Sequence, residues 1–245
     1  MSTREASRMM VDAVLTPMQD FRAHLGLQRW GCLALVALLE VRPDDESMVA
    51  TIVASGGISA LLGAMSLMKD DEDVQAAGCG VLGNSQIFDP SIVRLNGTAS
   101  IVAVLSAMDA FPRSERVSGL GSLAMANLVY KDDSNVEVIL ERHGSGRIIR
   151  AMHNLGSSVQ VQAAGSWALA AMAGKNEDLR EQALADGAAE ACEAAISRHG
   201  KHEGEDGSAA GGNGAVARNS RLALDRLHGI EPEEEAVTDD QCSVM

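Results

Sequence analysis

The clearest chemical motif of the chain lies at its C-terminal end. Cys242-Ser243-Val244-Met245 fits the C-a-a-X pattern for prenylation, with an aliphatic residue next to last and a final Met that favours a farnesyl group. We expect residues 230–241 to be extended and accessible to a modifying enzyme. The sequence therefore predicts farnesylation of Cys242, with an accidental match to the pattern as the alternative.

The charge of this tail opposes stable attachment to a membrane. Residues 231–241 hold six acidic side chains and no basic one, so an anionic lipid surface repels them. A single lipid chain without a second signal gives only marginal, reversible membrane binding. We expect a cytoplasmic protein that, when farnesylated, touches cytosolic membrane faces reversibly.

The other chemically active residue types show no catalytic or metal-binding pattern. No C-x-x-C pair is present, and we expect Cys32, Cys79 and Cys192 to be buried thiols. The glycines at 211–214 lack the Lys-Ser/Thr of a phosphate-binding loop. The histidines are scattered along the chain. We predict a non-enzymatic protein with no catalytic residue, metal site, cofactor or small-molecule substrate.

The elements that carry these residues repeat along the chain. One phrase centres on Gly31, Gly78, Gly121 and Gly165, which are spaced by 47, 43 and 44 residues. A second phrase ends at Met65, Met108, Met152 and Ile196, with steps of 43, 44 and 44. A fixed period in the forties is typical of a solenoid of stacked helices. The sequence thus predicts an all-α, right-handed solenoid.

Each repeat is expected to contain one helix that follows a glycine and a second helix that begins near a Val-Gln pair. A glycine in the middle of a helix costs about 1 kcal/mol relative to Ala, so the repeated glycines should allow neighbouring helices to approach closely. Met65, Met108 and Met152 share one repeat offset. We expect them in the core, with an adaptable binding surface as the alternative.

These phrases resemble armadillo repeats over residues 8–229, although HEAT repeats have a similar period. We expect about four armadillo-like repeats with a partial capping repeat at each end. The expected solenoid covers residues 1–229 and contains a flexible Gly-rich insertion at 199–214. Residues 230–245 are expected to form an acidic, disordered tail that ends in the sequence CSVM.

The armadillo resemblance implies a binding face made by the helices that begin at Val-Gln. In peptide-binding members these helices present a Trp and, four residues later, an Asn whose amide holds an extended peptide. Asn84 and Asn127 occupy the Asn position in adjacent repeats, and Trp167 occupies the Trp position one repeat later. The ladder is incomplete, and each residue also has a structural interpretation: an Asn that satisfies a nearby carbonyl, or a Trp in the core.

Composition limits the partners of such a protein. The net charge is -14, which does not favour nucleic acid. No run of apolar residues is long enough for a membrane span. Two hypotheses remain: a eukaryotic armadillo adaptor farnesylated at Cys242 that binds a protein or extended peptide on its concave face, and a soluble armadillo scaffold without lipid. Carriage of basic targeting peptides is a third.

Overall fold

The computed structural model describes residues 3–41, 46–84, 97–131, 133–200 and 212–230. Within these residues the regular elements are thirteen α-helices and no strand. The expected all-α solenoid is therefore confirmed. The acidic tail and Cys242 lie outside the described residues.

The helices fall into repeats of up to three. The first pair is α1 (Thr3–Asp20) and α2 (Leu25–Val41). The bounds of the others are α3 Glu46–Ala54, α4 Gly57–Leu67, α5 Glu72–Leu82, α7 Gly97–Ala110, α8 Glu115–Lys131, α9 Asn135–Glu141, α10 Gly144–Asn154, α11 Val159–Lys175, α12 Glu177–Ala185, α13 Ala188–His199 and α14 Gly212–Leu227.

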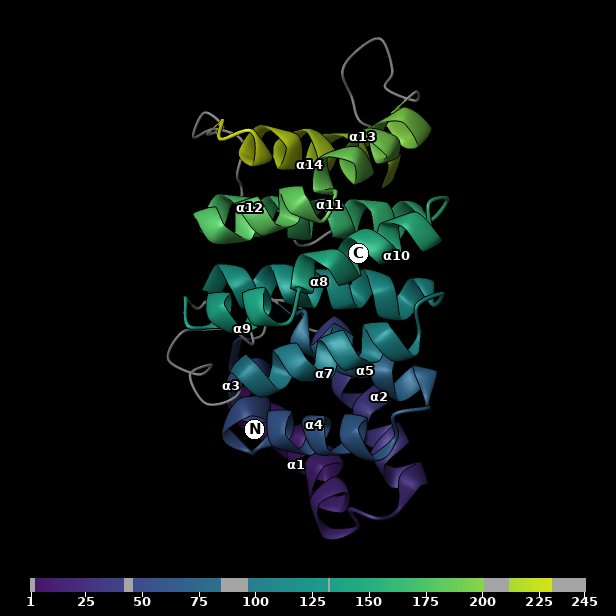
Figure 1. The fold of residues 1–245 in the computed structure, drawn as a ribbon. Helices are drawn as coiled ribbons and strands as arrows, with labels where there is room; N and C mark the ends of the chain where they lie inside the picture. Colours follow the sequence, from purple (N-terminus) through teal and green to yellow (C-terminus); the bar gives the residue numbers. More distant parts are fainter. Residues whose placement is uncertain (1–2, 42–45, 85–96, 132, 201–211, 231–245) are drawn as a thin grey trace.

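Equivalent helices stack in rows along the molecule. Figure 1 shows α1 at one end of the stack and α13 and α14 at the other. We call α2, α5, α8, α11 and α14 the third-helix row, because each packs on the next along the chain. We call α4, α7, α10 and α13 the second-helix row, which is joined by smaller contacts. One hydrophobic core runs between the rows through every repeat.

The repeated glycines are the points where the two rows touch. A Cβ added at Gly165 would lie 2.6 Å from Cγ of Met152, and one at Gly121 would lie 2.9 Å from Cγ of Met108. Gly78 faces Met65 in the same way. The three methionines are at most 3% exposed. The packing role of the glycines and the core position of these methionines are both confirmed.

Glutamine side chains tie the two helices of most repeats together. Nε2 of Gln75 donates to the carbonyl oxygens of Met65 and Met68 at 2.9 and 3.0 Å. Gln28 and Gln162 make the matching pairs of hydrogen bonds at the same sequence separations. Each amide thus satisfies carbonyls at the end of the preceding helix, where the helix itself supplies no donor. The Gln of the Val-Gln phrase therefore has a structural role.

One repeat departs from this pattern at Ser118. Its side chain is 1% exposed, and its Oγ has no hydrogen-bond partner among the described residues. Ser118 stands where Gln75 and Gln162 stand in the neighbouring repeats, but it is too short to reach the end of α7. A buried polar group without a partner is unfavourable, so this position is a weak point of the stack.

The sequence pattern overlooked the short first helices of the repeats. These helices, α3, α9 and α12, begin within or beside acidic segments of the chain. Their 7–9 residues are too few for a clear helical period. Acidic and polar residues of such segments also cap helices: Asp71 accepts from the backbone N–H of Val74, and Asn176 accepts from that of Leu179.

The second-row helices begin as the glycine phrase predicts. Gly56 and Gly187 precede α4 and α13 with φ of 77° and 94°, a left-handed conformation that glycine adopts readily. His143 takes the same place before α10, with φ of 50°. The ends of the expected 199–214 insertion are helical, since α13 extends to His199 and α14 starts at Gly212. Residues 201–211 lie outside the described part.

Among the described helices, none is by itself long and apolar enough to cross a membrane. The consecutive helices α3 and α4 meet the length and composition test only as a pair, with a bend of 68° between them.

Candidate interaction face of the third-helix row

The third-helix row presents a run of partly exposed apolar side chains. These residues are half-buried and occupy matching positions on α2, α8, α11 and α14, and those on α2, α11 and α14 also pack with one side on the core. We call this surface the third-row face and define it by Leu33 on α2, Leu123 on α8, Trp167 on α11 and Leu222 on α14. Apolar side chains that remain partly exposed along one face are suited to contacts with another protein.

The residues expected to bind a partner occupy different environments. Trp167 is half-buried on the third-row face. Asn84 is half-buried and follows the end of α5. Asn127 is 7% exposed, and its Nδ2 donates to the carbonyl oxygen of Gly83 at 2.6 Å. This hydrogen bond joins α8 to the end of α5, which is the structural interpretation that the sequence left open for Asn127.

The hydrogen bond of Asn127 has counterparts in later repeats. Nζ of Lys175 on α11 donates to the carbonyl oxygen of Tyr130 on α8 at 3.3 Å. Nη1 of Arg226 on α14 donates to that of Ala170 on α11 at 3.0 Å. Each third-row helix from α8 onward thus donates a side-chain hydrogen bond to a backbone carbonyl in the C-terminal half of the helix before it or just after its end.

Arg226 is half-buried. Burial lowers the pKa of its guanidinium, and the nearby Tyr130 acts in the opposite direction. The Arg226 side chain also lies over Gly174, where an added Cβ would be 2.9 Å from its Cδ. Arg226 occupies the ladder position that Asn127 occupies on α8. In both repeats this position is used for contact with the preceding helix.

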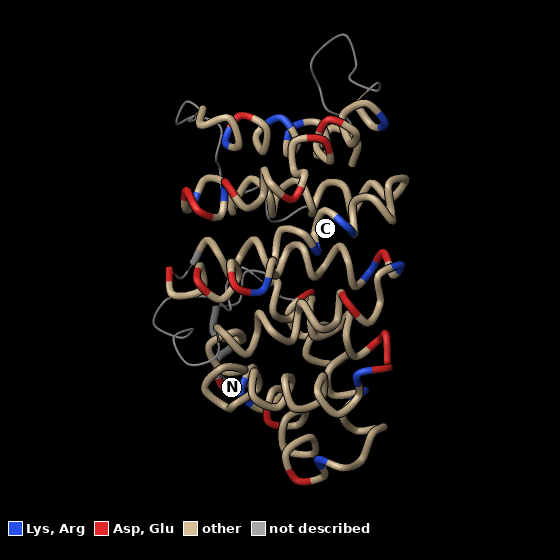
Figure 2. Tube along the Cα trace, viewed as in Figure 1, with Lys and Arg blue, Asp and Glu red and all other residues tan. Residues whose placement is uncertain are grey.

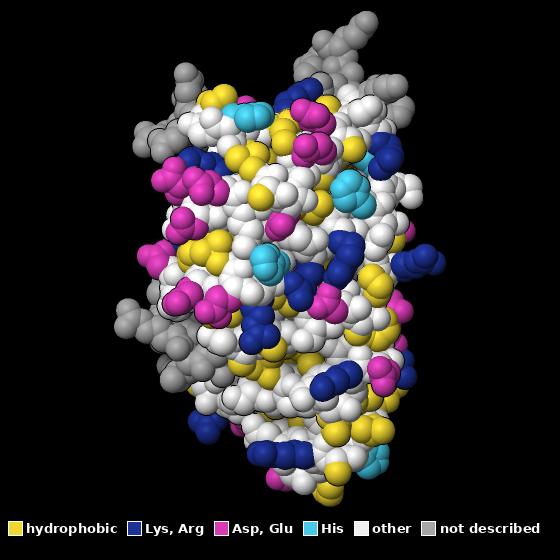
Figure 3. Space-filling model, viewed as in Figure 1, with side chains coloured by type: hydrophobic (Ala, Val, Ile, Leu, Met, Phe, Trp, Pro, Cys, Tyr) yellow, Lys and Arg dark blue, Asp and Glu magenta, His cyan; other side chains and the backbone are white. Residues whose placement is uncertain are grey.

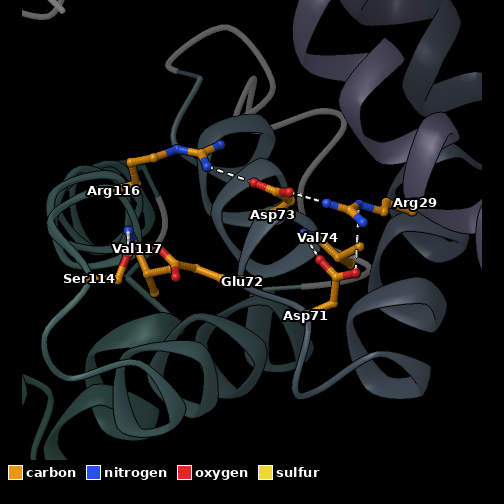
Figure 4. A network of polar contacts seen from close by, with 8 residues as sticks. All are labelled: Arg29, Asp71, Glu72, Asp73, Val74, Ser114, Arg116 and Val117. Atoms are coloured by element: carbon orange, nitrogen blue, oxygen red, sulfur yellow. Dashed lines mark hydrogen bonds and ion pairs between the residues drawn. The ribbon is translucent and has the colours of Figure 1, made fainter.

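Charged side chains bridge three helices at the opposite margin of the row. Asp73 at the start of α5 pairs with Arg29 of α2 and, at 2.7 Å, with Arg116 of α8 (Figure 4). The hydrogen bond to Arg116, and to a smaller extent that to Arg29, lowers the pKa of the Asp73 carboxyl group. Beside them Ser114 donates to Glu72 at 2.6 Å and accepts from the backbone N–H of Val117.

The same arrangement recurs one repeat later. Oγ of Ser158 donates to Glu115 at 2.8 Å, so the residue before α11 is tied to the first turn of α8. The acids also lie near helix N-termini, where the helix dipole favours negative charge. This margin of the row is therefore a set of inter-repeat bridges that hold the third-row helices in register.

Two exposed aromatic residues of this row escaped the sequence analysis. Trp30 on α2 is 71% exposed, and Tyr130 on α8 is 59% exposed. Trp30 lies three residues, or almost one helical turn, before Leu33 on α2. The only available signal was the rarity of aromatic residues, which form 2% of the sequence.

The cysteines of the described part are structural. Cys32, Cys79 and Cys192 are completely buried, as predicted. Burial raises the pKa of each thiol to about 12, so these groups are protonated at neutral pH and are poor nucleophiles. The described residues contain no group of three or more His, Cys, Asp or Glu placed to hold a metal ion.

The face that carries the second-helix row has a different surface. Figure 3 shows basic and acidic side chains there beside small, separate apolar areas. Asp109 of α7 pairs with Arg147 at 3.1 Å and with Arg150, both on α10. In the Cα trace many charges lie near helix ends and turns at the sides of the stack (Figure 2). Asp109 and its two arginine partners therefore bridge consecutive repeats on this face.

The repeat geometry agrees with the comparison to known families. The model of the LRRK2 ARM repeat family matches residues 3–207. The chain belongs to this family. The match favours armadillo over HEAT repeats and covers the helices from α1 to α13, whereas α14 follows it. No curated protein is a significant match to the chain. Armadillo (ARM) repeats are generally non-enzymatic and commonly bind proteins or peptides, which suggests a protein-interaction scaffold.

Proposed function

We propose that this ARM repeat chain is a non-enzymatic scaffold that binds a protein through the third-row face. The observation that supports this most is the line of half-buried apolar side chains from Leu33 through Trp167 to Leu222. Such side chains lose further apolar surface to water contact when a partner covers them, which is the main favourable term in protein association. Inter-repeat bridges at both margins keep the face rigid, which lowers the entropy cost of binding.

The hydrogen bonds of the row favour a folded partner over an extended peptide. A peptide main chain needs side-chain amides that can donate and accept. Asn127 already donates to Gly83, and Arg226 at the matched position donates to Ala170. Contacts to the third-row face would therefore be mostly apolar. Carriage of basic peptides by Asn84 and Asn127 remains the second candidate, and it predicts that Asn84→Ala with Asn127→Ala abolishes binding of such a peptide.

The test compares substitutions on the two rows. Partners captured by the wild-type chain are purified, and their binding is measured by calorimetry with Leu123→Glu and with Ser106→Glu. Leu123 lies on the third-row face, whereas Ser106 is exposed on α7 of the second-helix row. We expect Leu123→Glu to weaken binding at least about tenfold and Ser106→Glu to leave it unchanged. Loss of binding in Ser106→Glu alone would reject the assignment. Circular dichroism checks the fold of both variants.

We also propose that Cys242 is farnesylated and that the lipid gives reversible membrane contact. The sequence Cys242-Ser243-Val244-Met245 supports farnesylation. The acidic residues of segment 231–241, which holds no basic residue, support reversible rather than stable membrane binding. Intact mass of protein from eukaryotic cells tests this, with Cys242→Ser as the matched control. We expect a farnesyl thioether, a methyl ester and loss of the last three residues, all absent from the control. An unmodified wild-type mass would instead support a soluble scaffold without lipid.

A further inference from the structure

The third-row helices stack through two faces that can be assigned from contacts. A Cβ added at Gly80 would lie 3.6 Å from Leu120, and one at Gly83 would lie 3.3 Å from the backbone nitrogen of Ala124. Asn127 completes this side of α8 by its bond to Gly83. Leu120, Ala124 and Asn127 therefore face the preceding helix. We call this side of each third-row helix its N-side face.

The same register holds at the last helix. Asn219 of α14, which matches Leu120, donates through Nδ2 to the carbonyl oxygen of Ala163 on α11 at 3.0 Å. Arg226, which matches Asn127, reaches Ala170 of the same helix. On α8 and on α14, the contacts therefore show that this side of the helix faces the previous repeat.

In α2 these positions are occupied by apolar residues without a preceding third-row helix in the described chain. They are Trp30, Ala34 and Ala37. Trp30 is 71% exposed, whereas its counterparts Ala77 and Ala164 are 3% and 0% exposed. Ala37 is exposed, and Ala34 is half-buried. Leu27 and Leu38, on the same side of the helix, are also half-buried. The N-side face of α2 is therefore an apolar stacking surface open to solvent.

The opposite end of the stack has polar chemistry. On α14 the outward side carries Arg218, Arg221 and Asp225, and all three are exposed. Positions equivalent to Arg218 and Asp225 on α11 are Ala163 and Ala170, which are 5% and 0% exposed under α14. An apolar surface at one end and charges at the other do not match each other. Head-to-tail association of copies, with the α2 end of one on the α14 end of the next, is thus unfavourable.

We propose that the N-side face of α2 binds the same face of a second copy of this chain, related by a two-fold axis. A two-fold pairing brings identical surfaces together, so the apolar stripe of each copy meets an apolar stripe. It continues the helix-on-helix interface that already joins the repeats. Trp30 supports this occupant over a regularly stacked repeat, because interior repeats place only Ala77, Leu120 or Ala164 at this position. Burial of a Trp is a frequent source of interface affinity.

Electrostatics gives this dimer a distinctive salt dependence. Each copy has a net charge of -14, so two copies repel each other at low ionic strength. The contact itself is apolar and has no ion pair to screen. Added salt should therefore strengthen the dimer, whereas it would weaken an interface held by opposite charges. This interface goes beyond the proposed function, which uses the exposed side of the row.

Sedimentation velocity from nanomolar to high micromolar concentration tests the dimer. The protein is full-length Cys242→Ser, so that a lipid cannot cause association. We expect a monomer–dimer equilibrium that Trp30→Glu weakens at least about thirtyfold. Tyr130→Glu is the matched control, since Tyr130 is an exposed aromatic residue on α8, and we expect it to leave the equilibrium unchanged.

Fluorescence supplies a second measurement that does not depend on a destabilising variant. In Trp167→Phe protein, Trp30 is the remaining tryptophan. We expect its emission to shift to shorter wavelength as dimers form. A monomer at all concentrations would overturn the proposal, and so would a dimer that Trp30→Glu leaves intact. Retained partner binding by Trp30→Glu monomers would leave the proposed scaffold function standing.

Discussion

The two terminal helices of the third-helix row, α2 and α14, differ in how they are attached to the stack and in what their outer sides expose to solvent. The α2 end keeps the interior motif, with Gly31 against Met18 and Gln28 bonded to the end of α1, yet it exposes an apolar side. The α14 end abandons the motif: Ser220 stands in place of the glycine and bonds to Ser166 at 2.8 Å. There, polar side chains attach the helix and charges cover it. Similar core packing therefore does not determine the chemistry of the outer surface.

The largest expected effect concerns the glycine contact at the α2 end. Gly31→Ala places a Cβ against Met18 and should lower the free energy of unfolding by about 1–3 kcal/mol. Gly63→Ala is the matched control, because Gly63 is exposed in α4 with open space around it. It should raise stability by up to about 1 kcal/mol. Urea unfolding measures both, and equal effects would contradict the close approach of α1 and α2.

The matching substitution at the α14 end should have a smaller effect. Ser220→Ala removes the hydrogen bond to Ser166 without crowding the core, so we expect a loss of about 1 kcal/mol. Urea unfolding of this variant beside Gly31→Ala compares the two ends directly. A larger loss for Ser220→Ala than for Gly31→Ala would show that the polar attachment dominates the stack.

Much of the interior could be predicted from sequence because it repeats. The regular spacing of the glycines predicted a close approach of neighbouring helices, and the shared offset of Met65, Met108 and Met152 predicted their place in the core. The burial of Cys32 and Cys79 agrees with their position directly after two of these glycines. The sequence allowed Asn127 either to hold a peptide or to satisfy a carbonyl. It could not decide between these roles, because the carbonyl that Asn127 contacts, that of Gly83, is 44 residues away in the chain. The exposure of Trp30 depends on whether another helix covers α2. The sequence of α2 alone does not indicate this, so the exposure could not be predicted.

An interior repeat can be brought closer to the α2 pattern. Ser118→Gln should let the side chain reach the end of α7, as Gln28 reaches the end of α1, and should raise the free energy of unfolding by about 1 kcal/mol. Thermal unfolding measures the change. Gln75→Ser makes the reverse exchange and should lower stability by a similar amount. A loss of stability in Ser118→Gln would mean that the α7–α8 corner cannot accept the longer side chain.

The smallest expected effect concerns the charges beside α2. Asp73 pairs with Arg29 and Arg116 at an exposed site, so Asp73→Asn should cost less than about 1 kcal/mol at neutral pH. The pKa of Asp73 is lowered in the folded chain, so its stabilisation is present above the unfolded value of about 4 and is lost as pH falls through the folded value. Urea unfolding at pH 7 and pH 3 should show the difference between variant and wild type shrinking in acid. A difference that grows in acid would contradict the assignment.

The most direct test of the contrast between the ends is hydroxyl-radical footprinting of the two tryptophans in Cys242→Ser protein. In dilute solution we predict that Trp30 is oxidised several-fold faster than Trp167, because only Trp30 is largely exposed. At high concentration the rate at Trp30 should fall towards that of Trp167, which should not change. Equal protection of both residues at every concentration would contradict an open stacking surface on α2.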